Sequence, residues 1–172
     1  MPRTSSLSPR SAAAASAAVE VLVKDAGWNE VLPDPAGLAR AVVNAALAES
    51  EVREKFPSGE ISVALCLAGD EEVRALNRDF RKRDAPTNVL AFPSGEPEFL
   101  GDLVLALGVA KAEARAQGKG LADHAAHLIL HGFLHLAGFA HASAREAKVM
   151  ERLETRILKG LRIADPYRVG KA

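Results

Sequence analysis

The feature of this sequence that most restricts its fold is a set of three histidines in the segment His-Gly-Phe-Leu-His-Leu-Ala-Gly-Phe-Ala-His, residues 131–141. His131 and His135 are four residues apart, so on a helix their rings project from one face with Cβ atoms about 5–6 Å apart. Gly138 is placed to end that helix and to let the chain turn back. His141 can then supply a third nitrogen. The spacing predicts one metal ion held by these three histidines.

Three imidazoles favour a divalent transition metal. We expect one Zn²⁺ per chain, although nickel and copper bind histidine-rich sites at least as well. Three protein ligands leave a fourth coordination position open, which is typical of catalytic zinc. The spacing is also that of the metzincin proteases, but Gly132 stands where those proteases have a catalytic glutamate. Peptide hydrolysis by their mechanism is therefore disfavoured, and hydrolysis of another kind of substrate is expected.

Two further histidines, His124 and His127, precede this set on the same predicted helix. His127 lies four residues before His131, so it shares a helix face with the predicted ligands. It could support a ligand or contact the substrate. The alternative for both residues is a buried or partly exposed helix histidine without such a role, and the sequence leaves these readings open.

A second cluster is cationic and lies at the end of a predicted helix, where Arg78, Arg81, Lys82 and Arg83 place four positive charges within six residues. Such a run is often a solvated helix end, where cations also suit the helix dipole. Beside an open metal site, arginine is instead a suitable phosphate clamp, because its guanidinium is planar, bidentate and permanently charged. Lysine plus arginine and aspartate plus glutamate balance at 22 each, so any binding of a polyanion must come from a local patch of this kind.

Length and composition suit one domain. The chain has 172 residues, enough for a single hydrophobic core. Residues 1–18 are rich in serine and alanine, without an acidic residue, and we interpret them as a flexible extension because Pro2 and Pro9 interrupt any targeting helix. Residues 19–172 are expected to form the functional domain. No apolar stretch approaches the roughly 20 residues that span a bilayer, and the lone Cys66, predicted to be buried, excludes an internal disulfide. A cytoplasmic protein is expected.

Strands and helices are predicted in mixed order, which indicates an α+β fold. The predicted strands cover residues 19–23, 61–67, 89–92 and 103–107. The predicted helices cover residues 36–50, a segment from Asp70 as its cap through Val73, Leu76 and Phe80, a polar segment up to Gly118, residues 121–137, and a last segment that begins at Ser143. Glu146 follows Ser143 at the spacing of a capping box. Turns are predicted at residues 27–28, 33–35, 57–59 and 95–97.

The histidine and arginine segments together resemble the YbeY family of bacterial metal-dependent endoribonucleases, which act in rRNA maturation. The family pattern is His-Gly-x-Leu-His-Leu-x-Gly-[Tyr/Phe]-Asp-His, and residues 131–141 match every fixed position but one. Residues 76–93, with Leu76-Asn77, Phe80-Arg81 and Pro86-Thr87-Asn88-Val89-Leu90, are similar to a second family motif. Gly101-Asp102-Leu103 and Asp165-Pro166-Tyr167 are also typical. The resemblance covers about residues 19–168.

The resemblance implies a zincin-like α+β domain, in which a small mixed sheet packs against helices and the metal-binding helix is central. It implies cleavage of single-stranded RNA in maturation of the small-subunit rRNA 3′ end and in ribosome quality control, with the small ribosomal subunit as a partner. The three histidines carry over as ligands, and Arg81 matches an arginine that the family needs for activity. Arg81 is expected to hold the scissile phosphate, while the attacking group is either an activated water or the RNA 2′-OH. Asp102 is a weaker candidate for a supporting carboxylate.

Two departures from the family pattern concern activity. Ala140 replaces the aspartate before the third histidine, and Ala91 replaces a serine in the second motif. Losing a carboxylate beside a ligand removes a group that could orient it, so retained metal with slower cleavage is expected. Two other functions stay open at this point: another zinc-dependent metallohydrolase, and a non-catalytic ribosome-assembly factor whose metal is structural.

Overall fold

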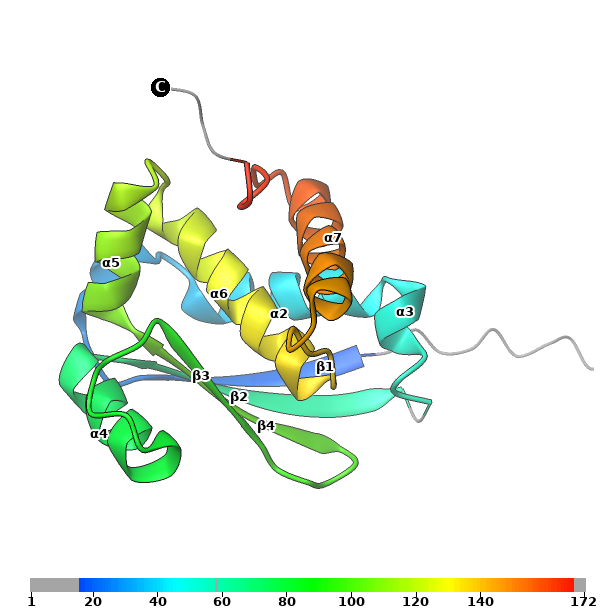
Figure 1. The fold of residues 1–172 in the computed structure, drawn as a ribbon, viewed down its shortest axis with the longest axis horizontal. Helices are drawn as coiled ribbons and strands as arrows, with labels where there is room; N and C mark the ends of the chain where they lie inside the picture. The colour runs from blue at the N-terminus through cyan, green and yellow to red at the C-terminus, as the bar shows by residue number, and fades with distance from the viewer. Residues whose placement is uncertain (1–15, 58, 169–172) are drawn as a thin grey trace, which may run out of the picture.

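A computed structural model of the protein describes residues 16–57 and 59–168. Its sheet has four strands in the order β1-β2-β4-β3, seen edge-on in Figure 1. The strands are β1 (Ser16–Val23), β2 (Glu60–Ala68), β3 (Val89–Pro93) and β4 (Phe99–Ala106). β1, β2 and β4 run parallel, and β3 pairs antiparallel with β4 at one edge. The predicted mixed sheet is confirmed.

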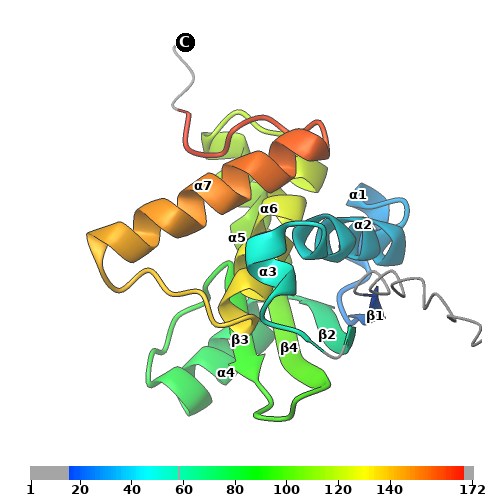
Figure 2. The same cartoon turned by 90° about the vertical axis from the view of Figure 1, so that its right-hand side faces the viewer.

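Helices lie on both faces of this sheet. They are α1 (Gly27–Val31), α2 (Pro35–Leu47), α3 (Ser50–Arg53), α4 (Asp70–Arg81), α5 (Leu107–Ala116), α6 (Leu121–Leu136) and α7 (Ala144–Gly160). α4 covers one face, and the other helices gather on the opposite face, with α6 between the sheet and α7 (Figures 1 and 2). The helix that carries the histidines is therefore central, as the α+β reading predicts. Within the described ranges, no helix combines the length and the apolar character needed to cross a membrane.

The alternation of side chains along the strands divides the apolar residues between two cores. On β2, the buried residues Ile61, Val63 and Leu65 face the larger core, which includes α6. Their neighbours face a smaller core beneath α4, which contains Val73 and Val104. Because parity decides the face, β2, β3 and β4 contribute to both cores, whereas the apolar residues of β1 pack only against the larger one.

Cys66, predicted to be buried, lies on the α4 side of β2 and is only half-buried. Burial nevertheless raises the pKa of its thiol, an effect to which Glu72 adds. Cys66 is a free cysteine and the one cysteine of the sequence.

Close packing fixes α6 against the sheet at Gly132. A Cβ atom at this position would lie 2.7 Å from Cδ2 of Leu103 and 3.2 Å from Cγ2 of Val89. Leu103 is itself buried in the larger core, so any larger side chain at residue 132 would have to displace core atoms. The position that would hold a protease glutamate is thus closed by β3 and β4.

The ends of α6 and α7 confirm the predicted caps. Gly138 has φ +97°, a conformation that favours glycine, and Phe139 donates its N–H to the carbonyl of Leu134 at 3.0 Å. α7 begins after Ser143, whose Oγ accepts from the Glu146 N–H at 3.1 Å. This tight turn between the helices brings residue 141 back over the end of α6.

Other predicted boundaries are wrong. α4 is preceded by Gly69 as its N-cap, and Asp70 instead accepts a hydrogen bond from the Val109 N–H. β4 begins at Phe99 rather than at residue 103. The predicted turn at residues 27–28 is the start of α1, and the fully buried Trp28 anchors that helix. α3 follows α2 as a separate short helix.

The predicted boundary of the N-terminal extension also differs from the structure. β1 begins at Ser16, which pairs with Glu60 of β2, so residues 16–18 belong to the sheet. Small alanine and serine side chains carry little strand signal, and the pairing with β2 supplies the backbone partners that fix the conformation. Residues 1–15 of the expected extension lie outside the described part of the chain.

Candidate metal centre

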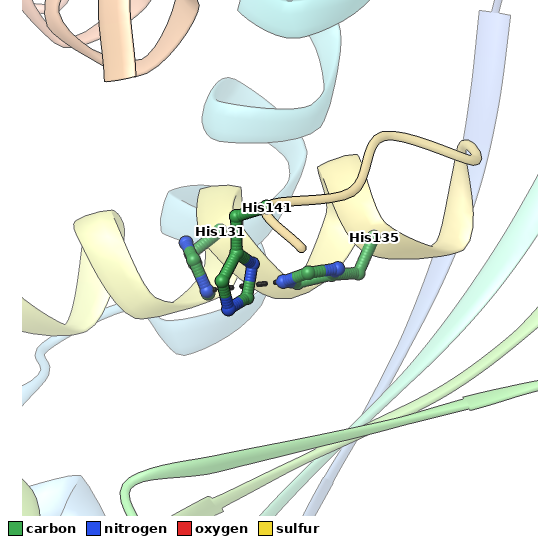
Figure 3. A group of neighbouring side chains, drawn as sticks. All are labelled: His131, His135 and His141. Carbon is green, nitrogen blue, oxygen red and sulfur yellow. Dashed lines mark hydrogen bonds between the residues drawn. The ribbon is translucent and has the colours of Figure 1, made fainter. Parts of the chain in front are cut away.

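The structure brings the three predicted ligand residues together at the C-terminal end of α6. His131 and His135 project from the helix, and His141 comes from the segment after Gly138 (Figure 3). One nitrogen of each ring lies within 4.8 Å of the other two. Nε2 of His131 and Nε2 of His135 are 3.2 Å apart. Two nitrogens at 2.0–2.1 Å from one tetrahedral ion would be about 3.3 Å apart, so this donor set fits an ion the size of zinc.

The protonation state of His135 also suits metal binding, which requires a neutral imidazole. Burial lowers the pKa of His135, and the positive charges that His131 and His141 would carry lower it further. His135 is therefore unprotonated at neutral pH. Its ring can then present a lone pair to a cation without first releasing a proton.

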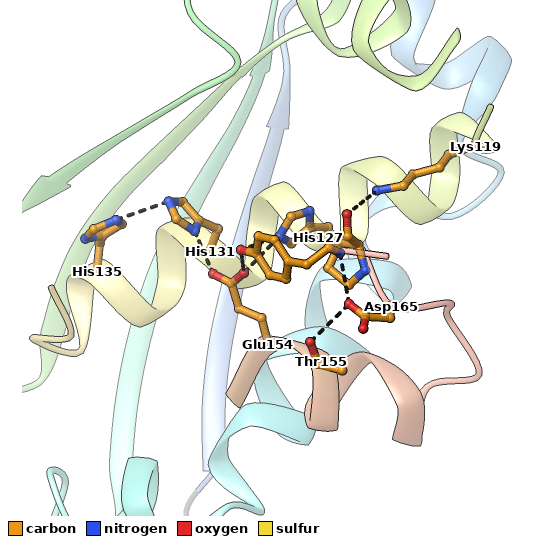
Figure 4. A network of polar contacts seen from close by, with 9 residues as sticks. Lys119, His127, His131, His135, Glu154, Thr155 and Asp165 are labelled. Carbon is orange, nitrogen blue, oxygen red and sulfur yellow. Dashed lines mark hydrogen bonds and ion pairs between the residues drawn. The ribbon is translucent and has the colours of Figure 1, made fainter. Parts of the chain in front are cut away.

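Glu154 of α7 is a supporting residue that the sequence reasoning missed. Its side chain is fully buried and accepts from Nδ1 of His131 at 2.6 Å and from Nε2 of His127 at 2.9 Å. The hydroxyl of Tyr167 donates a third hydrogen bond to it. Figure 4 shows Glu154 reaching from α7 to the histidine face of α6. With its Nδ1–H held by the carboxylate, His131 directs Nε2 toward His135, which is how outer carboxylates fix the tautomer of a ligand histidine.

The charge of Glu154 is secured by these donors. Burial alone would raise its pKa, but hydrogen bonds from His127, His131 and Tyr167 outweigh this and bring the pKa down to about 2. Burial and the neighbouring carboxylate in turn raise the pKa of Tyr167, so its hydroxyl stays a donor. The hydrogen bond between His127 and Glu154 also assigns a role to His127. His127 supports the carboxylate that in turn accepts from the candidate ligand His131.

Replacing the carboxylate of Glu154 tests this arrangement. We expect Glu154→Gln to weaken metal affinity about 10–100-fold, the usual cost of losing a partner of a ligand histidine. An amide oxygen is a weaker acceptor than a carboxylate oxygen, and the amide NH₂ would face groups that also donate. Titration with a competing chelator measures the affinity. Glu151→Gln on the exposed side of the same helix is the matched control and should bind as the wild type does. Equal affinities for all three proteins would contradict a role for Glu154.

A second group, His127, His131 and Glu154, also places three donor atoms within 4.8 Å of one another. It shares His131 with the first group, but His131 faces Glu154 through Nδ1 and His135 through Nε2. The carboxylate of Glu154 already accepts three hydrogen bonds and is fully buried, which leaves no room for a substrate. All three residues of the three-histidine group line a pocket, and His141 is exposed, whereas Glu154 of the second group does not line it.

That pocket has a volume of about 1090 Å³ and runs from the three histidines along α6. Arg81 and Arg83 line it, together with Ala91 of β3. Arg81 donates from Nη2 to the carbonyl of Ala91 at 2.7 Å, which holds its guanidinium at the edge of β3. The predicted phosphate-binding arginine thus shares one cavity with the predicted ligands.

The remaining candidates are placed elsewhere. Asp102 does not line the pocket; it shares the face of β4 with Val104, on the α4 side of the sheet, so its weaker candidacy as a supporting carboxylate is not supported. His124 pairs with Glu113 of α5 at 2.8 Å, and burial lowers its pKa. It acts as a link between α5 and α6.

The sequence of α7 explains why the role of Glu154 could not be predicted from spacing. The residue lies 13 positions before Tyr167 and 23 after His131, so no local spacing joins it to either. The available signal was its place among Met150, Leu153 and Ile157, which form the buried stripe of the helix. A charged residue within such a stripe needs a buried partner, and that requirement points to function.

Comparisons with known proteins show what the chain as a whole is similar to. The family model described as Endoribonuclease YbeY matches residues 30–162. The chain is similar to Endoribonuclease YbeY of Azorhizobium caulinodans, with 44% identity over 155 residues, covering 87% of this chain and 95% of that protein. It is also 48% identical over 149 residues to Endoribonuclease YbeY of Alkalilimnicola ehrlichii, covering 83% and 86% of the two chains.

A solved structure has a similar fold. The solution structure of TM1509 from Thermotoga maritima superposes with a TM-score of 0.55 at 22% identity, covering 88% of this chain and 99% of that one. This likeness concerns the fold.

Proposed function

This chain belongs to the Endoribonuclease YbeY family, and we propose from that membership and from the geometry of its pocket that it is a zinc-dependent enzyme that cleaves single-stranded RNA in rRNA processing. The observation that carries the metal dependence is the 3.2 Å separation of the His131 and His135 nitrogens beside His141. A matched family with an endoribonuclease name supports the choice of RNA as substrate.

In this proposal His131, His135 and His141 hold one Zn²⁺ ion. The ion would supply Lewis acidity, which activates water near neutral pH or polarises a phosphate oxygen. Glu154 keeps the Nδ1 proton of His131 away from the ion, and Tyr167 and His127 hold Glu154 in place. The chain's own task at this end of the pocket is therefore to present three fixed lone pairs.

Arg81 is proposed to hold the phosphate group that is cleaved. It lines the same pocket as the histidines, and none of the described carboxylates forms an ion pair with it. Its guanidinium uses one N–H group for the hydrogen bond to the Ala91 carbonyl. Its other N–H groups are available to phosphate oxygens. Charge that develops on those oxygens would be stabilised by a donor that is already oriented.

The proposed biological substrate is the 3′ end of small-subunit rRNA, with the small ribosomal subunit as partner in the cytoplasm. Family membership supports this assignment. The open pocket beside the histidines favours an enzyme over an assembly factor with a purely structural metal, because a structural site is closed by protein ligands.

Cleavage of a labelled single-stranded RNA tests the function directly. We expect the zinc-loaded protein to cut an RNA that contains the small-subunit 3′ end, chelation to stop the reaction, and added Zn²⁺ to restore it. A duplex of the same sequence should resist. Undiminished cleavage by protein shown to be free of metal would contradict the proposal.

The departure at Ala140 leads to a separate prediction. Ala140 is exposed and lies outside any helix, directly before His141, so the backbone has room for Ala140→Asp. The new carboxylate could orient His141 as Glu154 orients His131, and we expect a faster reaction or tighter metal binding, by up to about 10-fold. Wild type and variant must be compared at equal metal occupancy. If both quantities stay the same or fall, another group already performs this task, and Glu154 is the candidate.

A further inference from the structure

Phe80 is the most exposed large apolar residue in the described part of the chain, with 67% of its surface accessible. It lies in the last turn of α4, one residue before Arg81. Val73, earlier on the same helix, is fully buried, and Leu76 is packed against the smaller core. Phe80 belongs to neither core. One exposed apolar side chain is ordinary by itself, so the neighbours of Phe80 decide whether its ring has a role.

The ring of Phe80 is held by a second aromatic residue. Its centroid lies 5.6 Å from that of Phe92 on β3, with the rings at 66°. The guanidinium of Arg81 lies over the ring of Phe92, 5.4 Å from the centroid. Phe92 is half-buried against the smaller core, so it acts as a fixed support. Phe80 is therefore exposed and yet anchored on one side.

Positive charge surrounds this aromatic pair. Arg81, Lys82 and Arg83 are exposed, and within the described ranges none of the three forms an ion pair. The other large apolar residues with high exposure, such as Leu22 and Val149, lack such a run of cations beside them in the sequence. Aromatic rings beside a cationic strip are how proteins bind single-stranded nucleic acid without reading its sequence.

The position of β3 connects this surface with the pocket. β3 is an edge strand, with Ala91 facing the pocket and its neighbour Phe92 facing the α4 side. Arg81 bridges the two sides, since it lines the pocket, donates to the Ala91 carbonyl and covers Phe92. The edge of β3 therefore lies between the pocket wall at Ala91 and the ring of Phe80, which contacts Phe92.

We propose that Phe80, supported by Phe92, is a stacking platform for one unpaired base of an RNA strand that leaves the metal pocket across the edge of β3. The inference rests on the proposed function and adds a structural reason why the enzyme would prefer single-stranded RNA. In a duplex both faces of a base are already stacked, so only a single strand can offer a base to the ring. The platform thus favours single-stranded over double-stranded RNA.

Fluorescence anisotropy of a labelled RNA oligomer, with the full chain in its metal-loaded form, measures the contribution of the ring. Stacking contributes about 1–3 kcal/mol per base, so we expect Phe80→Ala to weaken binding of the single strand by about 5- to 150-fold. Binding of a duplex of equal length should change little, and metal content should not change. Phe80→Trp should bind as tightly as wild type or more tightly. Leu22→Ala, which removes an exposed apolar side chain on the far edge of the sheet, is the matched control.

The tryptophan variant also reports the contact directly. Trp28 is the one tryptophan of the chain and is fully buried, so the indole introduced by Phe80→Trp would be the exposed one. We expect single-stranded RNA to quench its fluorescence and the duplex to leave it unchanged.

The outcomes separate this inference from the proposed function. Cleavage by the wild type, with Phe80→Ala binding single strands within about twofold of wild type, would overturn the platform and leave the nuclease; it would assign Phe80 to a protein partner. An equal loss for single strand and duplex would overturn it as well. Absent cleavage with a selective loss of single-strand binding in Phe80→Ala would support the platform and contradict the nuclease.

Discussion

Replacement of His135 by alanine is expected to remove the bound metal ion and to abolish RNA cleavage. His135 lies between His131 and His141, and its ring centroid is 4.7 Å from each of theirs. Without His135, only two of the three ligand nitrogens remain. We expect the metal affinity to fall by more than the roughly 100-fold that the loss of a merely supporting partner costs. Elemental analysis after dialysis against buffered Zn²⁺ measures occupancy, and an RNA cleavage assay measures activity.

The matched control for His135→Ala is His124→Asn on the same helix. His124 pairs with Glu113 and belongs to neither group of potential ligands, so its replacement should leave the metal in place. A chelator should lower the melting temperature of wild type and of His124→Asn, since bound metal stabilises the folded state, but should have no effect on His135→Ala. Full metal occupancy in His135→Ala would show that the three histidines do not form the site.

Replacement of Arg81 by alanine is expected to leave the metal bound while cleavage falls by about 10²–10³-fold, the usual cost of losing an oriented donor to developing charge. Arg81 does not contact the histidines through any hydrogen bond; its contacts are with Ala91 and Phe92. Metal content should therefore match that of wild type. Single-turnover cleavage at saturating RNA separates the loss of rate from any loss of binding.

Two comparisons define the role of Arg81 further. Arg81→Lys keeps the charge but loses the planar fork, so it should recover only a small part of the rate. Lys82→Glu should mainly weaken RNA binding and flatten its dependence on salt. Small and equal effects at both positions would identify the cluster as a solvated helix end.

The histidine site could be predicted from the sequence because its geometry is local. His131 and His135 are one helical turn apart, and Gly138 fixes the return of the chain to His141, so spacing alone determines the arrangement. Glu154 and Tyr167 could not be assigned roles in the same way. Their positions follow from how α7 and the segment after it pack on α6, and such tertiary contacts leave no period in the sequence.

The fold shows the same division. The apolar run at residues 61–67 and the caps at Gly138 and Ser143 predicted β2 and the ends of α6 and α7, because each depends on neighbours in the chain. β1 begins earlier than predicted because its small residues are held by pairing with β2, and Phe80 is exposed although the spacing of its helix suggests an apolar face. In both cases the conformation or exposure depends on a partner that is distant in the sequence or outside the chain. For β1 this partner is β2, and for Phe80 we propose that it is an RNA base.

The hydrogen bond from Arg81 to Ala91 also affects the tendency of the sheet edge to pair with other molecules. β3 is an edge strand, and edge strands offer unpaired backbone groups to strands of other molecules. Here one such carbonyl is occupied by a charged side chain, and Pro93 lacks the N–H that a neighbouring strand would require. The guanidinium therefore protects the sheet from self-association as well as facing the pocket, which makes aggregation a property to monitor whenever Arg81 is replaced.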